Sequence, residues 1–519
     1  MIFNDWLGRR RQFTPDRVAI VDDASGQHYT YSGLDTRATR FAAILQGSLG
    51  IQPGDRVACL STNRIEYIDL YFACGKIGAV LVPLNVRLPA AGMTDLLEDC
   101  QPRLLVYESE FRQIASFASQ AKLVPCLLPI DLHDLGSDSE GNRTRRTGGR
   151  AGGQTIDAGV KVVEADEQDV AMILYTSGTT GRAKGAMISW RQIHWNALNT
   201  ILGLQLSPRD VAFMNMPLYH TGGWHVLFTP LMLLGGRVVL QKRFEPERCN
   251  QRVGPEGVTI LFAVPTMLRM MAEAPGFPAA DLSRLRFAIC GGEPCPLPLI
   301  ETYQQRGVAM RQGYGLTEAG PNCFSLPAED AIRKQGSIGF PNFHVGTRLA
   351  REDGGDAGVG EVGELLMKGP HLFAGYWNNQ PETDLALRAD WLHTGDLMTR
   401  DEEGYYSIVG RKKEMYVSGG ENVYPAQVER VLQQHPAVAL AAVVATPHPK
   451  WGEAGWAFVK LVQDCPVTEP DLRAWCRLHL AGYQCPAKVV VMEDLPVGYS
   501  GKIDKKALQQ RATELSATP

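Results

Sequence analysis

Short apolar runs alternate with stretches of helical periodicity along most of this chain, and the alternation limits the folds open to it. Arg56–Leu60 and Ala79–Pro83 are apolar runs typical of buried strands, whereas Tyr31–Leu49 and Glu66–Gly78 carry apolar residues at helical spacing. The same alternation resumes over residues 169–346. Strands separated by helices pair in parallel and are covered by those helices. The sequence therefore predicts an α/β protein with a largely parallel sheet.

The pattern changes after Gly410, and the chain is too long for one ordinary core at 519 residues. Beyond this point we expect helices over 426–434 and 470–480 and strands over 438–445, 456–462 and 488–492. About a hundred residues are a normal size for a separate domain. We predict a large N-terminal domain of stacked α/β sheet subdomains, residues 1–410, and a small mobile α+β C-terminal lid domain, residues 411–519.

Composition excludes several classes of protein. The net charge of −4 gives no global basic field that would recruit nucleic acid. The N-terminus lacks an apolar stretch long enough for a secretory signal, and no window is long enough for a membrane span. The eleven cysteines are scattered without a CxxC pair, as expected of reduced thiols. We expect a cytoplasmic protein with no nucleic-acid partner and no integral membrane segment, and a homodimer is compatible with the chain.

The strongest local signal is the segment YTSGTTGRAKG, residues 175–185, which follows an apolar strand. Glycines let a backbone approach a polyanion, hydroxyls donate to it, and Lys184 supplies a point cation. A Walker A loop would need Gly-Lys at 183–184, where the chain has Ala-Lys, so a generic P-loop NTPase is the weaker alternative. The sequence predicts a phosphate-binding loop formed by Thr176, Ser177, Gly178, Thr179, Thr180 and Lys184.

Further motifs follow in order: PLYHTGGW at 217–224, GGE at 291–293, QGYGLTE at 312–318, HTGD at 393–396, GRKKE at 410–414, SGGENVYP at 418–425 and YSGKID at 499–504. From about residue 15 to 510 the chain resembles the adenylate-forming (ANL) superfamily. That superfamily contains acyl-CoA and aryl-CoA synthetases, peptide-synthetase adenylation domains and beetle luciferases. The resemblance is strongest to the branch of acyl-CoA synthetases and fatty-acid–CoA ligases.

The resemblance implies how ATP is bound. Tyr314 stacks on adenine, Thr317 bonds the α-phosphate and Glu318 holds Mg²⁺, while Asp396 and Arg411 bind the ribose. An aromatic plate suits a base, and a carboxylate suits a hard cation that also grips phosphate oxygens. A further turn lines the adenine and acyl pockets in the family, and here it consists of Gly291, Gly292 and Glu293.

The C-terminal motifs carry the second half of the implied reaction. Lys502 matches the lysine that drives adenylation, and Lys413 matches the hinge about which the small domain rotates. Gly419 and Gly420 match the loop that lines the pantetheine tunnel of CoA ligases, and Trp451 matches a tryptophan near the CoA nucleotide. The resemblance thus implies ATP, Mg²⁺ and coenzyme A as cofactors and co-substrate.

The acid is expected to lie beside His220, which gates carboxylate entry in relatives, and beside Trp224 and Gly320. This lining is apolar and has no evident cation for a second carboxylate, which favours a medium- or long-chain fatty or an alicyclic monocarboxylic acid. The alternatives are an aryl acid or o-succinylbenzoate, an adenylating enzyme that loads a separate carrier protein, and a non-catalytic binding protein. The 213–224 segment lacks the Asp that would pair with an amino acid's ammonium group.

Overall fold

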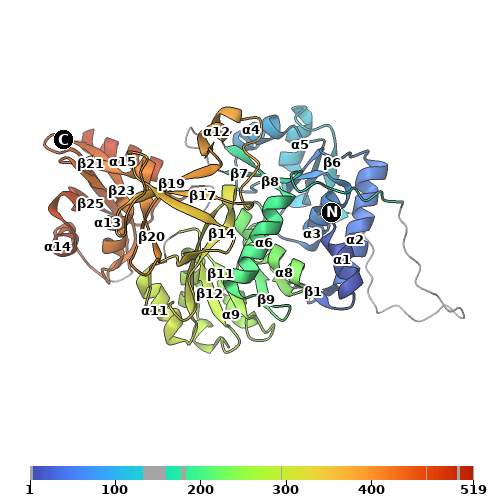
Figure 1. Cartoon of the computed structure of the whole chain (residues 1–519), viewed down its shortest axis with the longest axis horizontal. Helices are drawn as coiled ribbons and strands as arrows, with labels where there is room; N and C mark the ends of the chain where they lie inside the picture. The colour runs from blue at the N-terminus through green and yellow to red at the C-terminus, as the bar shows by residue number, and fades with distance from the viewer. Residues whose placement is uncertain are drawn as a thin grey trace, which may run out of the picture.

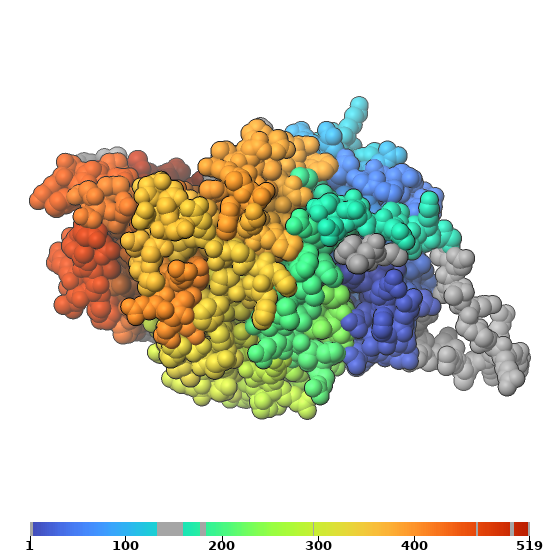
Figure 2. Space-filling view, viewed as in Figure 1, coloured from blue at the N-terminus to red at the C-terminus, as the bar shows by residue number. Residues whose placement is uncertain are grey.

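The computed structural model describes residues 4–132, 159–176, 183–293, 295–462, 465–498 and 503–517. Within these ranges the chain forms four β-sheets with helices packed on their faces. Figure 1 shows the C-terminal elements gathered at one end of the long axis, away from the N-terminal strands and helices. Figure 2 shows the same residues as a lobe beside the rest of the molecule. The α/β prediction is confirmed.

The largest sheet has nine strands in the order β15-β14-β13-β12-β11-β9-β10-β1-β2. Its central strands run parallel, and antiparallel pairs occur only toward its two edges. Its strands, in chain order, are β1 Val18–Asp22, β2 His28–Thr30, β9 Val211–Met214, β10 Arg237–Leu240, β11 Ile260–Ala263, β12 Phe287–Cys290, β13 Met310–Leu316, β14 Gly320–Ser325 and β15 Phe340–Pro341. The carboxyl ends of its parallel strands form one edge, where ligands bind in open α/β sheets.

A six-stranded sheet has the order β6-β5-β3-β4-β7-β8 and is parallel except for its last pair. Its strands are β3 Arg56–Leu60, β4 Val80–Pro83, β5 Leu104–Tyr107, β6 Leu127–Pro129, β7 Val170–Thr176 and β8 Lys184–Ser189. The strand predicted at Arg56–Leu60 has these bounds, and the next predicted strand begins one residue later, at Val80. One buried apolar cluster joins the two sheets, with Leu81 on one and Ile20 and Ile289 on the other.

Two smaller sheets follow. The first contains β16 Gly346–Ala350, β17 Gly363–Lys368, β18 Leu387–Arg388, β19 Trp391–Arg400 and β20 Tyr406–Arg411. The second contains β21 Tyr416–Ser418, β22 Glu421–Val423, β23 Val438–His448, β24 Gly452–Leu461 and β25 Lys488–Met492. The turn between these sheets is Lys412–Glu414. The domain boundary at 410/411 stays a prediction; β20 of the first sheet ends one residue past it, at Arg411, and the second sheet begins at Tyr416.

The helices cover these sheets and connect them (Figure 1). They are α1 Trp6–Phe13, α2 Tyr31–Ala43, α3 Ile65–Ile77, α4 Ala90–Cys100, α5 Arg112–Gln120, α6 Trp190–Leu204, α7 Thr221–His225, α8 Phe228–Leu234, α9 Pro246–Arg252, α10 Pro265–Glu273, α11 Leu297–Gln305, α12 Gln380–Ala386, α13 Pro425–Gln433, α14 Glu469–His479 and α15 Lys505–Ala517. Thr30 caps α2 by accepting from the N–H of Gly33, and the helix passes into a π-turn at Ile44–Ser48. The helix predicted over Tyr31–Leu49 therefore ends in a change of winding.

All eleven cysteines are free thiols, and most are buried. Among the described residues, no helix combines the length and the apolar character that crossing a membrane requires.

Two buried histidines make stability depend on pH. Burial lowers the pKa of His225 to about 3 and that of His371 to about 4. In the unfolded chain the pKa of a histidine is about 6.5. Below that pH the unfolded chain binds protons that the folded chain does not, so the free energy of unfolding is highest above pH 6.5 and falls toward pH 4. Each histidine contributes a slope of about 1.4 kcal/mol per pH unit in this window.

We therefore expect His225→Gln to reduce the loss of stability between pH 6.5 and 4.5, measured as the shift of the urea midpoint followed by tryptophan fluorescence. His28→Gln, at an exposed position on β2, is the control and should leave the pH dependence unchanged. Identical pH profiles for the wild type and His225→Gln would contradict the assignment of a neutral buried imidazole.

Candidate active site

The predicted phosphate loop joins β7 to β8, which pair as an antiparallel hairpin. Thr176 and Lys184 lie opposite each other at its open end, and the hydroxyl of Thr176 donates to the carbonyl of Lys184 over 3.4 Å. Four of the predicted phosphate-binding residues lie outside the described residues: Ser177, Gly178, Thr179 and Thr180. The two predicted phosphate-binding residues that are described, Thr176 and Lys184, thus face each other across the start of the loop.

Lys184 is held by residues from a distant part of the chain. Its ammonium group forms an ion pair with Glu382 in the first turn of α12 and lies 5.3 Å from the centre of the Tyr376 ring. The hydroxyl of Tyr376 donates to Oε1 of Glu318 over 2.8 Å. One tyrosine therefore contacts the predicted phosphate-binding cation and also the predicted metal ligand.

Glu318 occupies a short turn, Thr317–Ala319, between β13 and β14. The turn is fixed through its backbone, because the carbonyl of Thr317 accepts from Gln192 over 2.9 Å and the carbonyl of Glu318 accepts from the N–H of Phe373 over 2.8 Å. No group of three or more His, Cys, Asp or Glu side chains able to hold a metal occurs in the described ranges. Mg²⁺ is commonly bound by one or two carboxylates together with substrate phosphates, so this single carboxylate fits it.

Tyr314, Asp396 and Arg411 meet from three different strands, β13, β19 and β20. The hydroxyl of Tyr314 donates to Oδ2 of Asp396 over 2.6 Å, and Nε of Arg411 lies 3.0 Å from Oδ1. The charge of Asp396 raises the pKa of Arg411, and burial, followed by the same carboxylate, raises the pKa of Tyr314. The structure thus assembles the three residues that sequence comparison assigned to adenine and ribose.

The predicted GGE turn follows the carboxyl end of β12. Gly292 has a φ of +85°, a conformation that favours glycine. A Cβ on Gly291 would lie 3.3 Å from the ring of Phe262. Glu293 follows directly in the same turn. Because Phe262 lines the pocket described next, the turn adjoins that pocket.

A small pocket lies at the carboxyl ends of β9 and β11, with an open volume of about 10 Å³, roughly the space of one water molecule. It is lined by apolar side chains and glycines, which are Phe213, Met214, Met216, Gly222, Gly223, Leu227, Phe228 and Phe262. A Cβ on Gly223 would lie 2.6 Å from the carbonyl of Pro217, so any larger residue at position 223 would require a shift of the backbone.

The three predicted acid-pocket residues occupy different surroundings. His220 precedes the first residue of α7, and its ring lies 4.7 Å from that of Tyr219. Trp224 is fully buried behind the pocket, where it stacks on Tyr71 at 4.8 Å. Gly320 has a φ of +79°, and a Cβ on it would lie 2.6 Å from the amide oxygen of Asn196. Their roles toward the acid stay predictions.

The described C-terminal motifs lie on the second small sheet and on the turn that precedes it. Gly419 and Gly420 form the turn between β21 and β22 with φ values of +62° and +90°. The N–H of Gly419 donates to the carbonyl of Trp451 over 2.9 Å, and Trp451 is 45% exposed. Lys413 lies in the turn between the two small sheets, and Lys502 lies outside the described residues. The structure therefore brings the two predicted CoA-binding elements together.

Sequence reasoning did not find the residues that hold the pocket wall. Asn63 is buried, its amide nitrogen donates to the carbonyl of Met216 over 2.9 Å, and its oxygen accepts from the N–H of Leu218 over 3.3 Å. The neighbouring Thr62 donates to Oε2 of buried Glu108 from its N–H, at 3.0 Å, and from its hydroxyl, at 2.7 Å. These contacts cross between elements far apart in sequence, so no local pattern signals them.

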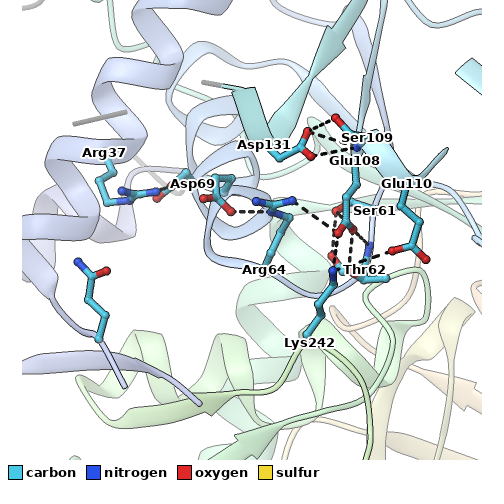
Figure 3. Close-up of polar contacts among 12 residues, drawn as sticks. Arg37, Ser61, Thr62, Arg64, Asp69, Glu108, Ser109, Glu110, Asp131 and Lys242 are labelled. Atoms are coloured by element: carbon cyan, nitrogen blue, oxygen red, sulfur yellow. Dashed lines mark hydrogen bonds and ion pairs between the residues drawn. The ribbon is translucent and has the colours of Figure 1, made fainter. Parts of the chain in front are cut away.

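Figure 3 shows Glu108 between Ser61 and Thr62 on one side and Lys242 and Arg64 on the other. The ammonium group of Lys242 lies 2.7 Å from Oε1 of Glu108. Hydrogen bonds from Lys242 and Thr62 outweigh the effect of burial and lower the pKa of Glu108 to about 2. The carboxylate therefore joins residues that follow β3, β5 and β10, which belong to two different sheets.

Comparison with known proteins identifies the family of this chain. Residues 7–377 match the family of AMP-binding enzymes, and residues 427–502 match the AMP-binding enzyme C-terminal domain. The chain is 37% identical to feruloyl-CoA synthase of an Amycolatopsis species (98% of each chain covered) and 33% identical to long-chain fatty acid–CoA ligase FadD13 of Mycobacterium tuberculosis (98% of each). It is also similar to the structure of o-succinylbenzoate CoA synthetase from Bacillus subtilis in complex with its acyl-adenylate intermediate, with a TM-score of 0.83, 30% identity and 98% of each chain covered.

The chain belongs to the AMP-binding enzyme family, the adenylate-forming superfamily that its motifs resemble. Within that family it is an AMP-forming acid–thiol ligase of the acyl-CoA synthetase branch, with ATP, Mg²⁺ and coenzyme A as its cofactors and co-substrate.

We expect Asn63→Ala to raise KM for the acid about tenfold while KM for ATP stays near the wild-type value. The substitution leaves the carbonyl of Met216, which lines the pocket, and the N–H of Leu218 without the Asn63 partner, at a cost of about 1–3 kcal/mol. Steady-state kinetics with each substrate varied in turn measures the effect.

Asn250→Ala is the matched control. Asn250 is equally buried and donates to the carbonyl of Met271 over 2.9 Å, but it lies on α9, outside the pocket wall. It should lower stability without changing KM for the acid. Equal effects of the two variants on that KM would refute a specific role for Asn63.

Proposed function

We propose that this enzyme converts an apolar monocarboxylic acid into its CoA thioester through an acyl adenylate, and that the preferred acid carries an aryl group. The observation that carries the proposal is the pocket bounded by Phe213, Phe228 and Phe262. Its lining is made of apolar side chains and glycines, so a second carboxylate would be buried without a partner at high cost. This argues against o-succinylbenzoate and for a flat, uncharged acyl group.

The floor of the pocket favours an aryl group over a long chain. Phe228 lines the pocket and packs edge-on against Trp224, with ring centres 5.8 Å apart, and against Tyr71 at 6.3 Å. Any acyl group needs more room than the roughly 10 Å³ of this pocket, so side chains must move to admit it. An aryl ring would then pack against the aromatic rings of the cluster, whereas a long alkyl chain would have to displace them. The fatty or alicyclic acid favoured by sequence is the second candidate, because Met214 and Met216 are adaptable side chains that could open the pocket.

The first half-reaction joins the acid to AMP. Asp396 and Arg411 would hold the ribose, Tyr314 the adenine, and Thr317 the α-phosphate. Lys184 would exchange Glu382 for phosphate oxygens, and Glu318 would hold Mg²⁺, which when bound neutralises phosphate charge. Lys502 would supply a cation to the charge that develops as the carboxylate attacks. The hydroxyls and glycine of the loop, Thr176, Ser177, Gly178, Thr179 and Thr180, would complete the triphosphate site, and Gly291, Gly292 and Glu293 would border the adenine and the acyl group.

The second half-reaction transfers the acyl group to a thiol. The small domain, residues 411–519, would rotate about Lys413, withdraw Lys502 and bring the turn at Gly419 and Gly420 to the adenylate. Trp451 would lie beside the CoA nucleotide. The exposure of its ring and its contact with Gly419 support this assignment. We also propose that the enzyme is cytoplasmic, that it forms a homodimer, and that its other partners are small molecules only.

The proposal predicts the outcome of an acid panel. With ATP, Mg²⁺ and CoA, an arylpropenoic acid should be used with a kcat/KM at least about tenfold above that of palmitate, about 1.4 kcal/mol of discrimination. AMP release with and without CoA, with products identified by mass spectrometry, is the measurement. Preference for palmitate would overturn the aryl assignment and leave the ligase class intact, whereas adenylate without thioester would favour loading of a carrier protein.

Replacement of the motif lysine separates the two half-reactions. Lys502→Ala should slow adenylation about 100-fold, as loss of a group that stabilises transition-state charge does. Thioester formation from a supplied acyl adenylate should stay close to the wild-type rate. Lys506→Ala, an exposed lysine two residues before Leu508 on α15, is the control and should affect neither step. An equal loss in both half-reactions would contradict the assignment.

A further inference from the structure

Four arginines line a second cleft that the ligase reaction does not use. They are Arg17, Arg209, Arg237 and Arg284, and the cleft has a volume of about 440 Å³. The cleft and the apolar pocket lie at opposite ends of β9, because Val211 at the start of the strand lines the cleft and Met214 at its end lines the pocket. The cleft is therefore a separate site at the amino end of the nine-stranded sheet.

The positive charge in this cleft is not neutralised by the protein. Within the described ranges none of the four arginines forms an ion pair within 4.0 Å of a carboxylate. Arg17 donates to the carbonyl of Gly235 over 3.1 Å, and Arg237 donates to the carbonyl of Glu256. These backbone contacts orient two guanidinium groups and leave their charge in place.

Asp210, the one carboxylate in the lining of the cleft, already has hydrogen-bond partners outside the four arginines. Both oxygens of Asp210, which is buried, accept from Arg286 at 2.7 and 2.8 Å, and one also accepts from the hydroxyl of Thr259 at 2.8 Å. Asp281 is near Arg284 but farther than ion-pair distance. Like charges converging on one cleft repel one another, so an anion of several charges would relieve the repulsion.

We propose that this cleft binds a small multivalent phosphate anion of the class of inorganic di- or tripolyphosphate. Guanidinium groups match phosphate oxygens through paired N–H donors, and four of them suit a chain of phosphates better than a single charge. The remaining lining residues are Val18, Pro208, Asp210, Val211, Gly236, Gly257 and Thr259, which supply no ring on which a nucleobase could stack. The phosphate chain itself, and not a nucleoside, is thus the recognised group.

The test is hydrogen–deuterium exchange of the full chain with sodium tripolyphosphate as the probe, at constant ionic strength. Exchange locates the binding, so the cleft segments 207–211, 235–238 and 256–260 are read separately from the segments of the ATP site. We expect protection of the cleft segments in the wild type. In the double variant Arg209→Ala/Arg284→Ala the concentration for half-protection should rise at least about tenfold, because two charge-assisted contacts are lost.

The control variant is Arg477→Ala/Arg511→Ala, which removes the same charge from exposed positions on α14 and α15 and should keep the wild-type protection. ATP should protect the cleft no better than tripolyphosphate. Both double variants should retain the acid–CoA ligase activity of the wild type, which verifies folding. Absence of protection in the wild-type cleft at millimolar tripolyphosphate, or equal weakening in both double variants, would overturn the proposal.

Discussion

The buried carboxylate of Glu108 connects the two large sheets at the edge where the apolar pocket lies. It accepts from Thr62, after β3, and pairs with Lys242, after β10. The side chain of Lys242 is half exposed, so solvent screens this ion pair, and the buried carboxylate is held mainly by its two hydrogen bonds from Thr62. Asn63 follows Thr62 directly and donates a hydrogen bond to the backbone carbonyl of Met216 in the pocket wall. The position of the pocket wall therefore depends on an interaction that lies outside the pocket.

The proposed ATP site follows a related principle, because its charged groups are paired with other residues of the protein. Lys184 pairs with Glu382, Asp396 pairs with Arg411, and Glu318 accepts from Tyr376. Unpaired charges in such a half-buried site would be destabilising. The pairs also orient the groups in advance, and preorganised groups need little rearrangement when substrate charge develops. Phosphate and ribose oxygens would then replace partners of the same chemical kind.

Sequence reasoning found the elements whose signal is local. The strands Arg56–Leu60 and Lys488–Met492 have the predicted bounds, because short apolar runs between turn residues determine a buried strand. The motif residues Tyr314, Asp396 and Arg411 contact one another, and their roles toward adenine and ribose stay predictions. Tyr376 and Glu382 were not found, since their partners Glu318 and Lys184 lie 58 and 198 residues away. Such pairs are decided by how the sheets pack, which one sequence does not encode in any local pattern.

The ion pairs around the turn at 412–414 support Lys413 as the hinge. On its N-terminal side Arg411 pairs with Asp396 and Lys412 pairs with Glu364, so these first two residues of the predicted small domain are held by the large domain and would stay with it during a rotation about Lys413. On its C-terminal side Glu414 pairs with Lys505 at 2.7 Å, and Lys505 also pairs with Glu429 at 2.8 Å.

Each set of pairs lies on one side of Lys413, so rotation there would carry both sets without breaking either. Among the contacts that cross the boundary are hydrogen bonds from Arg269 to the carbonyl of Ala439 and from Arg430 to the carbonyl of Ile408. Because water can replace a backbone carbonyl as acceptor at modest cost, these contacts oppose rotation far less than a buried ion pair would. The strong electrostatic contacts thus fall into two groups, one on each side of Lys413, which is the arrangement that the proposed rotation requires.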